Sequence, residues 1–258
     1  MKLIYAIILG IVQGLTEFLP VSSSGHLVLL QNIFGIENNV ILFDVVLHIG
    51  TLFAVIIAYR HSILDLIKHP FSRKMKFLVV GTIPTVIIAL LFKDFFESAF
   101  SGNLLFVGFL ATAILLLIAD FCDKKYKNNK KMTYSKMMIM GVFQGFAILP
   151  GLSRSGSTIT SSIVMGVNKK DALEYSFLLS IPIIVASMVY ELIKTPITTI
   201  EISVMPFVFG LLFSAVFGFL AIKFMIKLVQ NKSYKYFSIY LIILSIFLIL
   251  NQYFFNWF

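Results

Sequence analysis

The chain has 258 residues, of which 59% are apolar and only 13% charged, and its mean hydropathy is +0.96. Soluble domains are nearer half apolar and a quarter charged, so this composition excludes an ordinary soluble domain and predicts an all-α polytopic membrane protein. The single cysteine, Cys122, excludes an internal disulfide, and the four histidines show no recognisable metal-site spacing.

Six stretches have the length and composition of membrane-spanning helices, each with roughly the 17–25 residues that a bilayer core demands. They cover residues 41–59, 77–93, 103–121, 174–194, 203–223 and 236–257. Most of the 21 Lys and Arg residues lie in three connections, at 60–76, 122–136 and 223–235. Short loops rich in Lys and Arg stay in the cytoplasm, so the positive charge orients the chain and no nucleic-acid partner is expected.

Two further segments do not fit this count of spans. With the three basic loops inside, residues 137–173 begin and end inside, although they contain two short apolar runs. We therefore expect a re-entrant helical hairpin at about 137–165, and a matching one at about 1–34 that enters from the outer face. Each half then has one hairpin and three spans. Because three is odd, the second half is upside down, which is an inverted-topology repeat.

The predicted organisation is a single membrane domain, 1–258. Its first repeat covers residues 1–121, its second repeat covers 137–258, and residues 122–136 form a basic cytoplasmic linker between them.

Two polar stretches interrupt the apolar sequence where the hairpins should turn, one from Gln13 to His26 and one from Gln144 to Thr158. The copies share residues in the same order, with Gly10, Gln13, Gly14, Ser22, Ser24 and Gly25 matching Gly141, Gln144, Gly145, Ser153, Ser155 and Gly156. The chain thus carries one motif twice. Glu17 and His26 occur only in the first copy and Arg154 only in the second, as expected if both build one site.

A helix that breaks and restarts directs free backbone N–H groups and a positive dipole end toward the break. Restarts are predicted near Ser24-Gly25 and near Ser155-Gly156. Two such ends, with hydroxyl groups and the planar fork of Arg154, predict a site for a phosphate-like anion. Its phosphate-binding residues would be Ser22, Ser24, Gly25, Ser153, Ser155, Gly156 and Thr158. Alternatively, Glu17 and Arg154 only pair with each other and hold the hairpins together.

His26 would lie in the first turn of a restarted helix, where the dipole disfavours the imidazolium and leaves a neutral ring able to attack or to transfer a proton. Glu17 could take or orient a proton or bind a metal ion. Gln13, one turn earlier on the same face, could support Glu17, and Gln144 holds the matching position in the second motif.

Asp44 and His48 are four residues apart within the predicted span 41–59. This spacing predicts a buried hydrogen-bonded pair, and the alternative is that the two residues support the site or provide a proton path.

A family resemblance rests on two runs: Gln13-x-x-x-Glu17 through Pro20-Val21-Ser22-Ser23-Ser24-Gly25-His26, and Pro150-Gly151-Leu152-Ser153-Arg154-Ser155-Gly156-Ser157-Thr158. Together with the chain length and the Phe43-Asp44 and Glu174-Tyr175-Ser176-Phe177 runs, they resemble the undecaprenyl-diphosphatase (bacitracin-resistance) family. The resemblance implies an integral membrane phosphatase that hydrolyses undecaprenyl diphosphate to undecaprenyl phosphate and inorganic phosphate. Recycling this lipid carrier serves bacterial cell-wall synthesis and confers bacitracin resistance.

The resemblance also implies catalytic or phosphate-binding roles for Glu17, Ser22, Ser23, His26, Ser153, Arg154 and Thr158. It implies a divalent cation, Mg²⁺ or Ca²⁺, as cofactor, with Glu17 as its ligand. Members often have Glu where this chain has Gln13, and this departure weakens a metal site built from two carboxylates.

The expected partners are the polyprenyl diphosphate substrate and membrane lipids, and a homodimer is left open. The expected place is the bacterial cytoplasmic membrane, as a multi-pass protein. The active site should face the extracytoplasmic side, because the hairpin that carries His26 is predicted to enter from outside.

Two other functional classes share features with these motifs. A lipid-phosphate or anion transporter would use the same inverted-repeat site but would need no nucleophile. The type 2 phosphatidic acid phosphatases also use a Ser-Gly-His turn and an Arg, but they need a second His after the Arg, and every His here precedes Arg154.

The nucleophile is either His26 or Ser23. Serine needs an adjacent base, which Glu17 or His26 could supply, whereas neutral imidazole needs no deprotonation. The sequence alone therefore favours His26.

Overall fold

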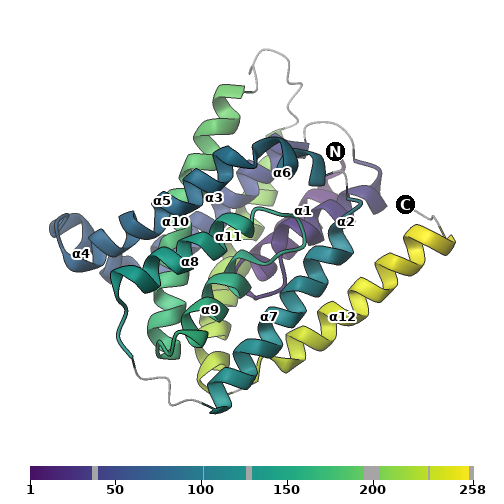
Figure 1. Ribbon diagram of the computed structural model, residues 1–258. Coiled ribbons are helices and arrows are strands. Elements are labelled where there is room, and N and C mark those ends of the chain that lie inside the picture. The colour runs from purple at the N-terminus through teal and green to yellow at the C-terminus, as the bar shows by residue number, and fades with distance from the viewer. Residues whose placement is uncertain (37–39, 101, 126–129, 195–203, 232, 256–258) are drawn as a thin grey trace.

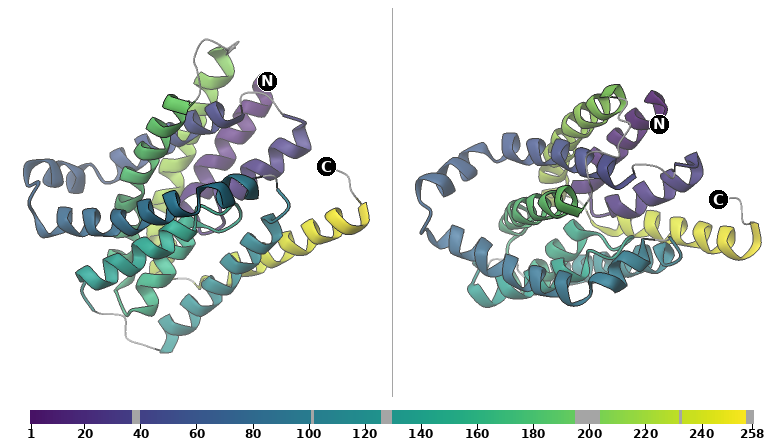
Figure 2. Two further views of the ribbon diagram at one scale, coloured as in Figure 1. Left: turned by 45° about the horizontal axis from the view of Figure 1, so that its top comes forward. Right: turned by 90° about the horizontal axis from the view of Figure 1, so that it is seen from above.

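The chain folds into a bundle of helices in the computed structural model, which describes residues 1–36, 40–100, 102–125, 130–194, 204–231 and 233–255 (Figure 1). The helices are α1 Leu3–Phe18, α2 Ser23–Phe34, α3 Val40–Ala58, α4 Arg60–Lys68, α5 Arg73–Leu91, α6 Lys93–Ala99, α7 Leu105–Lys125, α8 Tyr134–Phe146, α9 Arg154–Val164, α10 Lys169–Lys194, α11 Val204–Asn231 and α12 Lys235–Leu250, followed by a π-helical turn, Asn251–Phe255. In both views of Figure 2, the corner formed by α4 projects on the side opposite α12.

Six segments in this part of the chain are long and apolar enough to cross a membrane. They are Val40–Ala58, Arg73–Leu91, Leu105–Lys125, Lys169–Tyr190, Val204–Leu228 and Lys235–Phe255. The prediction of an all-α polytopic membrane protein with six spans is therefore confirmed.

Two spans begin earlier than hydropathy alone predicts, because side chains cap a polar first turn. Ser72 precedes α5 and its hydroxyl accepts the backbone N–H of Met75 at 3.3 Å. At the start of α10, the Asn168 side chain accepts the N–H of Asp171 at 2.9 Å. Such caps satisfy backbone donors that a polar helix end would otherwise leave free. The helices thus start at Arg73 and Lys169 rather than at the predicted residues 77 and 174.

The helices of the two motif-bearing pairs, α1–α2 and α8–α9, are shorter than the spans. The first helix of each pair packs against the opposite half of the chain. Helix α1 packs along α11, and α8 packs along α5, so the first helix of each half lies against a span of the other half. Helices α7 and α12 pack against each other, as do α3 and α10. An exchange of this kind is what a two-fold relation between halves produces. The re-entrant path of the two pairs through a membrane stays a prediction, as do the limits of the repeats.

Close contacts between α5 and α8 depend on a glycine. A Cβ atom on Gly141 would lie 1.9 Å from the carbonyl oxygen of Gly81, which is a backbone atom and cannot move cheaply. The same proximity lets the Thr85 hydroxyl donate to the Gly141 carbonyl at 2.8 Å. Small residues at helix crossings are typical of membrane bundles, where close backbone packing drives association. This crossing therefore holds α8 closely against α5 just before the second motif begins.

We predict that Gly141→Ala destabilises the protein by about 1–3 kcal/mol, as expected for overpacking at a backbone contact. Alanine is the better helix former, so only the collision with Gly81 can produce a loss. Thermal unfolding of the purified protein in detergent measures the effect. Ser135→Ala, at an exposed position on α8, is the matched control. Equal melting temperatures for Gly141→Ala and the native protein would contradict the prediction.

Candidate active site

Helices α2 and α9 both begin at a serine cap within their motif. The Ser22 hydroxyl accepts the N–H of Gly25 at 3.3 Å, and the Ser153 hydroxyl accepts the N–H of Gly156 at 3.0 Å. The restarts therefore come slightly earlier than predicted, at Ser23 and Arg154. The α9 cap is also held by α7, because Thr112 accepts the N–H of Ser153 at 2.9 Å. The first turns of both helices direct backbone donors toward the motif loops.

The backbone at Ser22 adopts an unusual conformation. Its φ is +68°, and no other non-glycine residue in the described ranges has a positive φ. Such a conformation is costly for a residue with a Cβ and persists only where its surroundings enforce it. In this conformation, the carbonyl oxygen of Ser22 accepts hydrogen bonds from both the backbone N–H and the side-chain Nδ1–H of His26.

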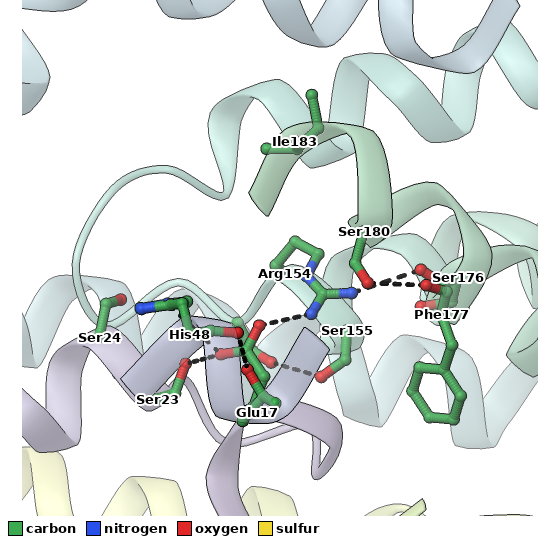
Figure 3. A network of polar contacts seen from close by, with 12 residues as sticks. Glu17, Ser23, Ser24, His48, Arg154, Ser155, Ser176, Phe177, Ser180 and Ile183 are labelled. Atoms are coloured by element: carbon green, nitrogen blue, oxygen red, sulfur yellow. Dashed lines mark hydrogen bonds and ion pairs between the residues drawn. The ribbon is translucent and has the colours of Figure 1, made fainter. Parts of the chain in front are cut away.

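Glu17 lies at the centre of a hydrogen-bonded cluster drawn from three helices (Figure 3). Its Oε2 accepts from the Ser23 hydroxyl at 2.5 Å and from Gln13 Nε2 at 3.0 Å, and its Oε1 accepts from Arg154 Nη2 at 2.6 Å. The residue is only 7% exposed. The structure thus joins the acidic residue of the first motif to the basic residue of the second, with Ser23 and Gln13 placed as the motif spacing predicts.

Arg154 is held from a second side by α10. Its Nη1 donates to the Ser176 carbonyl at 3.3 Å, while the Ser176 hydroxyl pairs with Thr158 at 2.7 Å. Thr158 in turn donates to the Arg154 carbonyl at 2.8 Å. These contacts hold the guanidinium where it meets Glu17. The Ser176 contribution was not found from the sequence, where it was noted only within a family-like run.

The motif loops also contact each other directly. The Ser155 hydroxyl donates to the Leu19 carbonyl at 3.0 Å and pairs with the Ser153 hydroxyl at 3.2 Å. The Ser24 hydroxyl pairs with Ser22 at 3.3 Å. Most of the predicted phosphate-binding hydroxyls therefore lie around the junction of the two motifs.

Gly25 in the first motif allows this close approach, and Gly156 in the second relieves crowding within its own helix cap. A Cβ on Gly25 would lie 2.6 Å from the ring of Phe109 and 2.9 Å from the Cα of Gly151, and one on Gly156 would lie 3.1 Å from Ser153 Cβ. For Gly25 in particular, the structure assigns a packing reason in addition to the predicted exposure of backbone N–H groups.

Gln144 lies apart from the Glu17 cluster. Its Nε2 donates to the Thr85 hydroxyl at 3.2 Å and to the Leu179 carbonyl at 3.4 Å, so it links α8 to α5 and α10. The motif repeat predicted a role matching that of Gln13. The environments differ because α8 has no acidic residue one turn later, where α1 has Glu17.

His48 lies next to the Glu17 cluster, whereas the sequence predicted that it pairs with Asp44. Its Nε2 lies 3.8 Å from Glu17 Oε2, while its Nδ1 bonds to the backbone carbonyl of Asp44 at 2.7 Å. A carbonyl only accepts, so Nδ1 carries the hydrogen. The Asp44 carboxylate instead accepts from Gln31 at 2.7 Å. The expected side-chain pair of Asp44 and His48 is thus replaced by a bond to the preceding helical turn, and the imidazole faces Glu17.

His26 has a different set of partners from the Glu17 cluster. Its Nδ1 faces the Ser22 carbonyl at 2.7 Å, and its Nε2 lies 2.6 Å from the hydroxyl of Tyr240 on α12. Its ring also meets Phe109 edge to face at 5.2 Å. Within the described residues, no hydrogen bond links His26 to Glu17 or Ser23. Tyr240 could not be found from the sequence, because it lies in an apolar span far from both motifs.

The surroundings of Glu17 do not form a divalent-cation site. No group of three His, Cys, Asp or Glu residues that could hold a metal occurs in the parts of the chain that the structure describes. The guanidinium of Arg154 occupies one Glu17 oxygen and would repel a cation, and Mg²⁺ and Ca²⁺ require several oxygen ligands. A divalent cation therefore remains a prediction from the family resemblance.

Comparisons with known proteins agree with the motif. A family model described as "Bacitracin resistance protein BacA" matches residues 6–247. The chain is 44% identical over 251 residues to the undecaprenyl-diphosphatase of Carboxydothermus hydrogenoformans, covering 96% of each chain. It is 42% identical over 259 residues to undecaprenyl-diphosphatase 4 of Bacillus thuringiensis (strain Al Hakam), covering 98% of each chain.

A third relative, the undecaprenyl-diphosphatase of Halothermothrix orenii, is 41% identical over 258 residues and covers 97% of this chain and 98% of its own. Since the family match and these relatives extend over nearly the whole length, the chain belongs to the BacA family of bacitracin-resistance proteins.

Proposed function

We propose that this membrane protein hydrolyses undecaprenyl diphosphate to undecaprenyl phosphate and inorganic phosphate. The observation that carries the proposal is the contact of Ser23, Glu17 and Arg154, which combines a nucleophile, a base and an anion-binding group. The names of the relatives support the same substrate. A transporter would use Arg154 to bind an anion but would have no use for a serine held against a buried carboxylate.

The terminal phosphate would bind between the starts of α2 and α9. Backbone N–H groups in the first turns of both helices and the guanidinium of Arg154 are suitable donors for its oxygens. Arg154 now donates to Glu17 and to the Ser176 carbonyl, so an entering phosphate would share or replace these acceptors. The hydroxyls of Ser22, Ser24, Ser153 and Ser155 line the same junction.

The contacts favour Ser23 over His26 as the attacking group. Ser23 already donates to Glu17 at 2.5 Å, so its base is in contact, whereas both ring nitrogens of His26 are engaged by Ser22 and Tyr240. The Ser23 oxygen forms a bond to the terminal phosphorus while Glu17 takes the serine proton. The bridging P–O bond breaks, and undecaprenyl phosphate leaves with the electron pair.

Water then completes the reaction. Its oxygen attacks the phosphorus, the bond from phosphorus to the serine oxygen breaks, and Glu17 returns the proton to Ser23. The inorganic phosphate thus gains its new oxygen and its hydrogens from the water molecule, and both side chains regain their starting states. His48, whose Nε2 lies near Glu17, is placed to influence the charge of this carboxylate.

Arg154→Lys should lower turnover by about 10²–10³-fold, the loss typical of removing one preorganised charge-stabilising donor. Lysine keeps the charge but loses the planar fork that reaches both Glu17 and Ser176. The measurement is phosphate release from a prenyl diphosphate by purified protein in detergent, with Arg73→Lys as the control at a distant arginine. Near-normal turnover in Arg154→Lys would mean that charge alone is sufficient.

Glu17→Gln should lower turnover by about 10²–10⁴-fold, because the serine loses its general base. A rapid quench of the native enzyme with substrate labelled in the terminal phosphate should trap an acid-stable phosphoserine at Ser23, which Ser23→Ala abolishes. Ser98→Ala, exposed on α6, is the control. An acid-labile, base-stable phosphate on the His26 peptide would instead reinstate histidine as the nucleophile.

We further propose that the protein lies in the bacterial cytoplasmic membrane with its site facing outward. The distribution of Lys and Arg over the connections supports this orientation. Spheroplasts given a water-dispersible short-chain prenyl diphosphate should release phosphate into the medium, while sealed inverted vesicles should not until they are permeabilised. The diphosphate is too polar to cross hydrocarbon. The opposite pattern would place the site on the cytoplasmic side.

A further inference from the structure

The contact between His26 and Tyr240 is not used by the reaction described above. Tyr240 comes from α12, 214 residues along the chain, and its hydroxyl lies 2.6 Å from His26 Nε2. The two rings are stacked, with centroids 5.8 Å apart and planes 13° apart. His26 is 8% exposed and Tyr240 is 45% exposed. A buried imidazole is therefore linked to a phenol that reaches the outside of the described bundle.

Hydrogen-bond chemistry fixes the direction of this contact. The Ser22 carbonyl can only accept, so Nδ1 of His26 carries a hydrogen. A neutral ring then has a bare Nε2, to which Tyr240 donates. If the ring takes a second proton, Nε2–H donates to the phenol oxygen, and the phenolic hydrogen is free to turn outward. The start of α2 disfavours this charged ring in the free protein, but a bound anion stabilises it, and the pair then offers an O–H donor backed by a positive charge.

The surroundings of the pair leave it able to serve an anion. The ring of His26 meets Phe109 of α7 and Tyr240 of α12, both of them uncharged. The nearby carboxylate of Glu17 is already bound by Ser23 and Arg154. The pair therefore adds a separate donor to the site rather than completing the Glu17 cluster.

The position of the pair relative to Ser23 suggests which anion it meets. His26 follows Ser23 by three residues on α2, so the two side chains lie on one face of that helix. Arg154 binds Glu17, which is the hydrogen-bond partner of Ser23, whereas Tyr240 binds His26 one turn further along α2. A diphosphate with its terminal phosphorus at Ser23 and Arg154 would extend its second phosphate toward α12.

Beyond Tyr240, the exposed face of α12 carries apolar side chains. Ile243 and Phe247 follow Tyr240 by three and seven residues, the spacing of one helix face, and are 63% and 38% exposed. Tyr240 thus places a polar group where an apolar stripe meets the motif loops. A lipid with a charged head and an isoprenoid tail has the same order of polarity.

We propose that the His26–Tyr240 pair is the subsite for the phosphate that remains on the lipid, with the isoprenoid chain lying along α12. This inference rests on the proposed function, because it needs a substrate with two phosphates. Tyr240 would bind and stabilise the departing lipid phosphate, whose negative charge grows as the bridging P–O bond breaks.

The test compares two products as ligands of the purified full-length protein. Farnesyl monophosphate reports on the lipid-phosphate subsite, and inorganic phosphate reports on the site at Arg154. Tyr240→Phe keeps the stacked ring and removes only the hydroxyl. It should weaken farnesyl monophosphate binding about 10-fold or more, as expected for loss of a hydrogen bond to a charged group. Inorganic phosphate should bind as before, whereas Arg154→Lys should weaken its binding.

Tyr236→Phe is the matched control, since Tyr236 lies one turn earlier on α12 and is 71% exposed. His26→Gln is a second variant expected to act like Tyr240→Phe. Unchanged binding of farnesyl monophosphate in Tyr240→Phe would overturn the subsite. An equal loss for both ligands would also overturn it, because that pattern means a general structural role.

Calorimetric titration measures this binding without turnover, and this separates the two proposals. Native protein that binds farnesyl monophosphate through Tyr240 but releases no phosphate from farnesyl diphosphate would refute the phosphatase and retain the subsite. Normal phosphate release, together with farnesyl monophosphate binding that does not depend on Tyr240, would retain the phosphatase and refute the subsite.

Discussion

The buried ion pair of Glu17 and Arg154 is the contact on which the rest of the site depends. These residues are 137 positions apart, and each comes from a different copy of the motif. Removing one partner from such a pair typically costs about 3–5 kcal/mol, because the other charge is left buried and uncompensated. The pair therefore fixes how the two motif loops face each other. It also holds the guanidinium and the carboxylate at a site suited to an anion.

Backbone contacts provide the rigidity that this pair needs. Helix α8 crosses α5 at Gly141 and Gly81, and the loop before α9 is bound to α7 through Thr112. The first motif is fixed similarly, because a Cβ on Gly14 would lie 2.7 Å from backbone atoms of α11. Each motif is thus held by helices that carry none of the predicted catalytic groups. Side chains that must meet within hydrogen-bond distance benefit from supports that cannot shift independently.

Local sequence was sufficient to predict the spans and the members of the central cluster. Hydropathy gave the six spans, and the spacing of Gln13, Glu17 and Ser23 around a helix break placed three groups that do meet. The charge difference between the copies predicted that both motifs build one site, and the direct pairing of Glu17 with Arg154 was the alternative interpretation of these two residues. The spans and these contacts could be predicted because each depends on neighbours in sequence or on the strong preference of buried opposite charges for each other.

The remaining site neighbours depend on packing between distant helices, which no local pattern encodes. Tyr240 sits in an apolar span and contacts His26 only because α12 packs beside α7. His48 faces Glu17 because its other nitrogen binds the preceding helical turn rather than the Asp44 carboxylate. For Gln144, the repeat in the sequence predicted too much: it matches Gln13 in the motif, but its side chain binds Thr85 and not a carboxylate. A repeated motif predicts similar backbone paths more reliably than similar side-chain environments.

The two serine caps show that even the backbone paths have diverged. Ser22 has a φ of +68°, whereas Ser153, at the matching position, has a φ of −69°. The carbonyl of each serine nevertheless accepts the backbone N–H four residues later, from His26 in one copy and from Ser157 in the other, so the difference lies in the turn that leads into the cap. A glutamate and a histidine placed at the matching positions of the second copy would therefore follow a turn of different shape, and they would not reproduce the geometry of the first copy. The division of labour between the two copies thus includes a difference in main-chain geometry, and exchanging side chains alone would not make the copies equivalent.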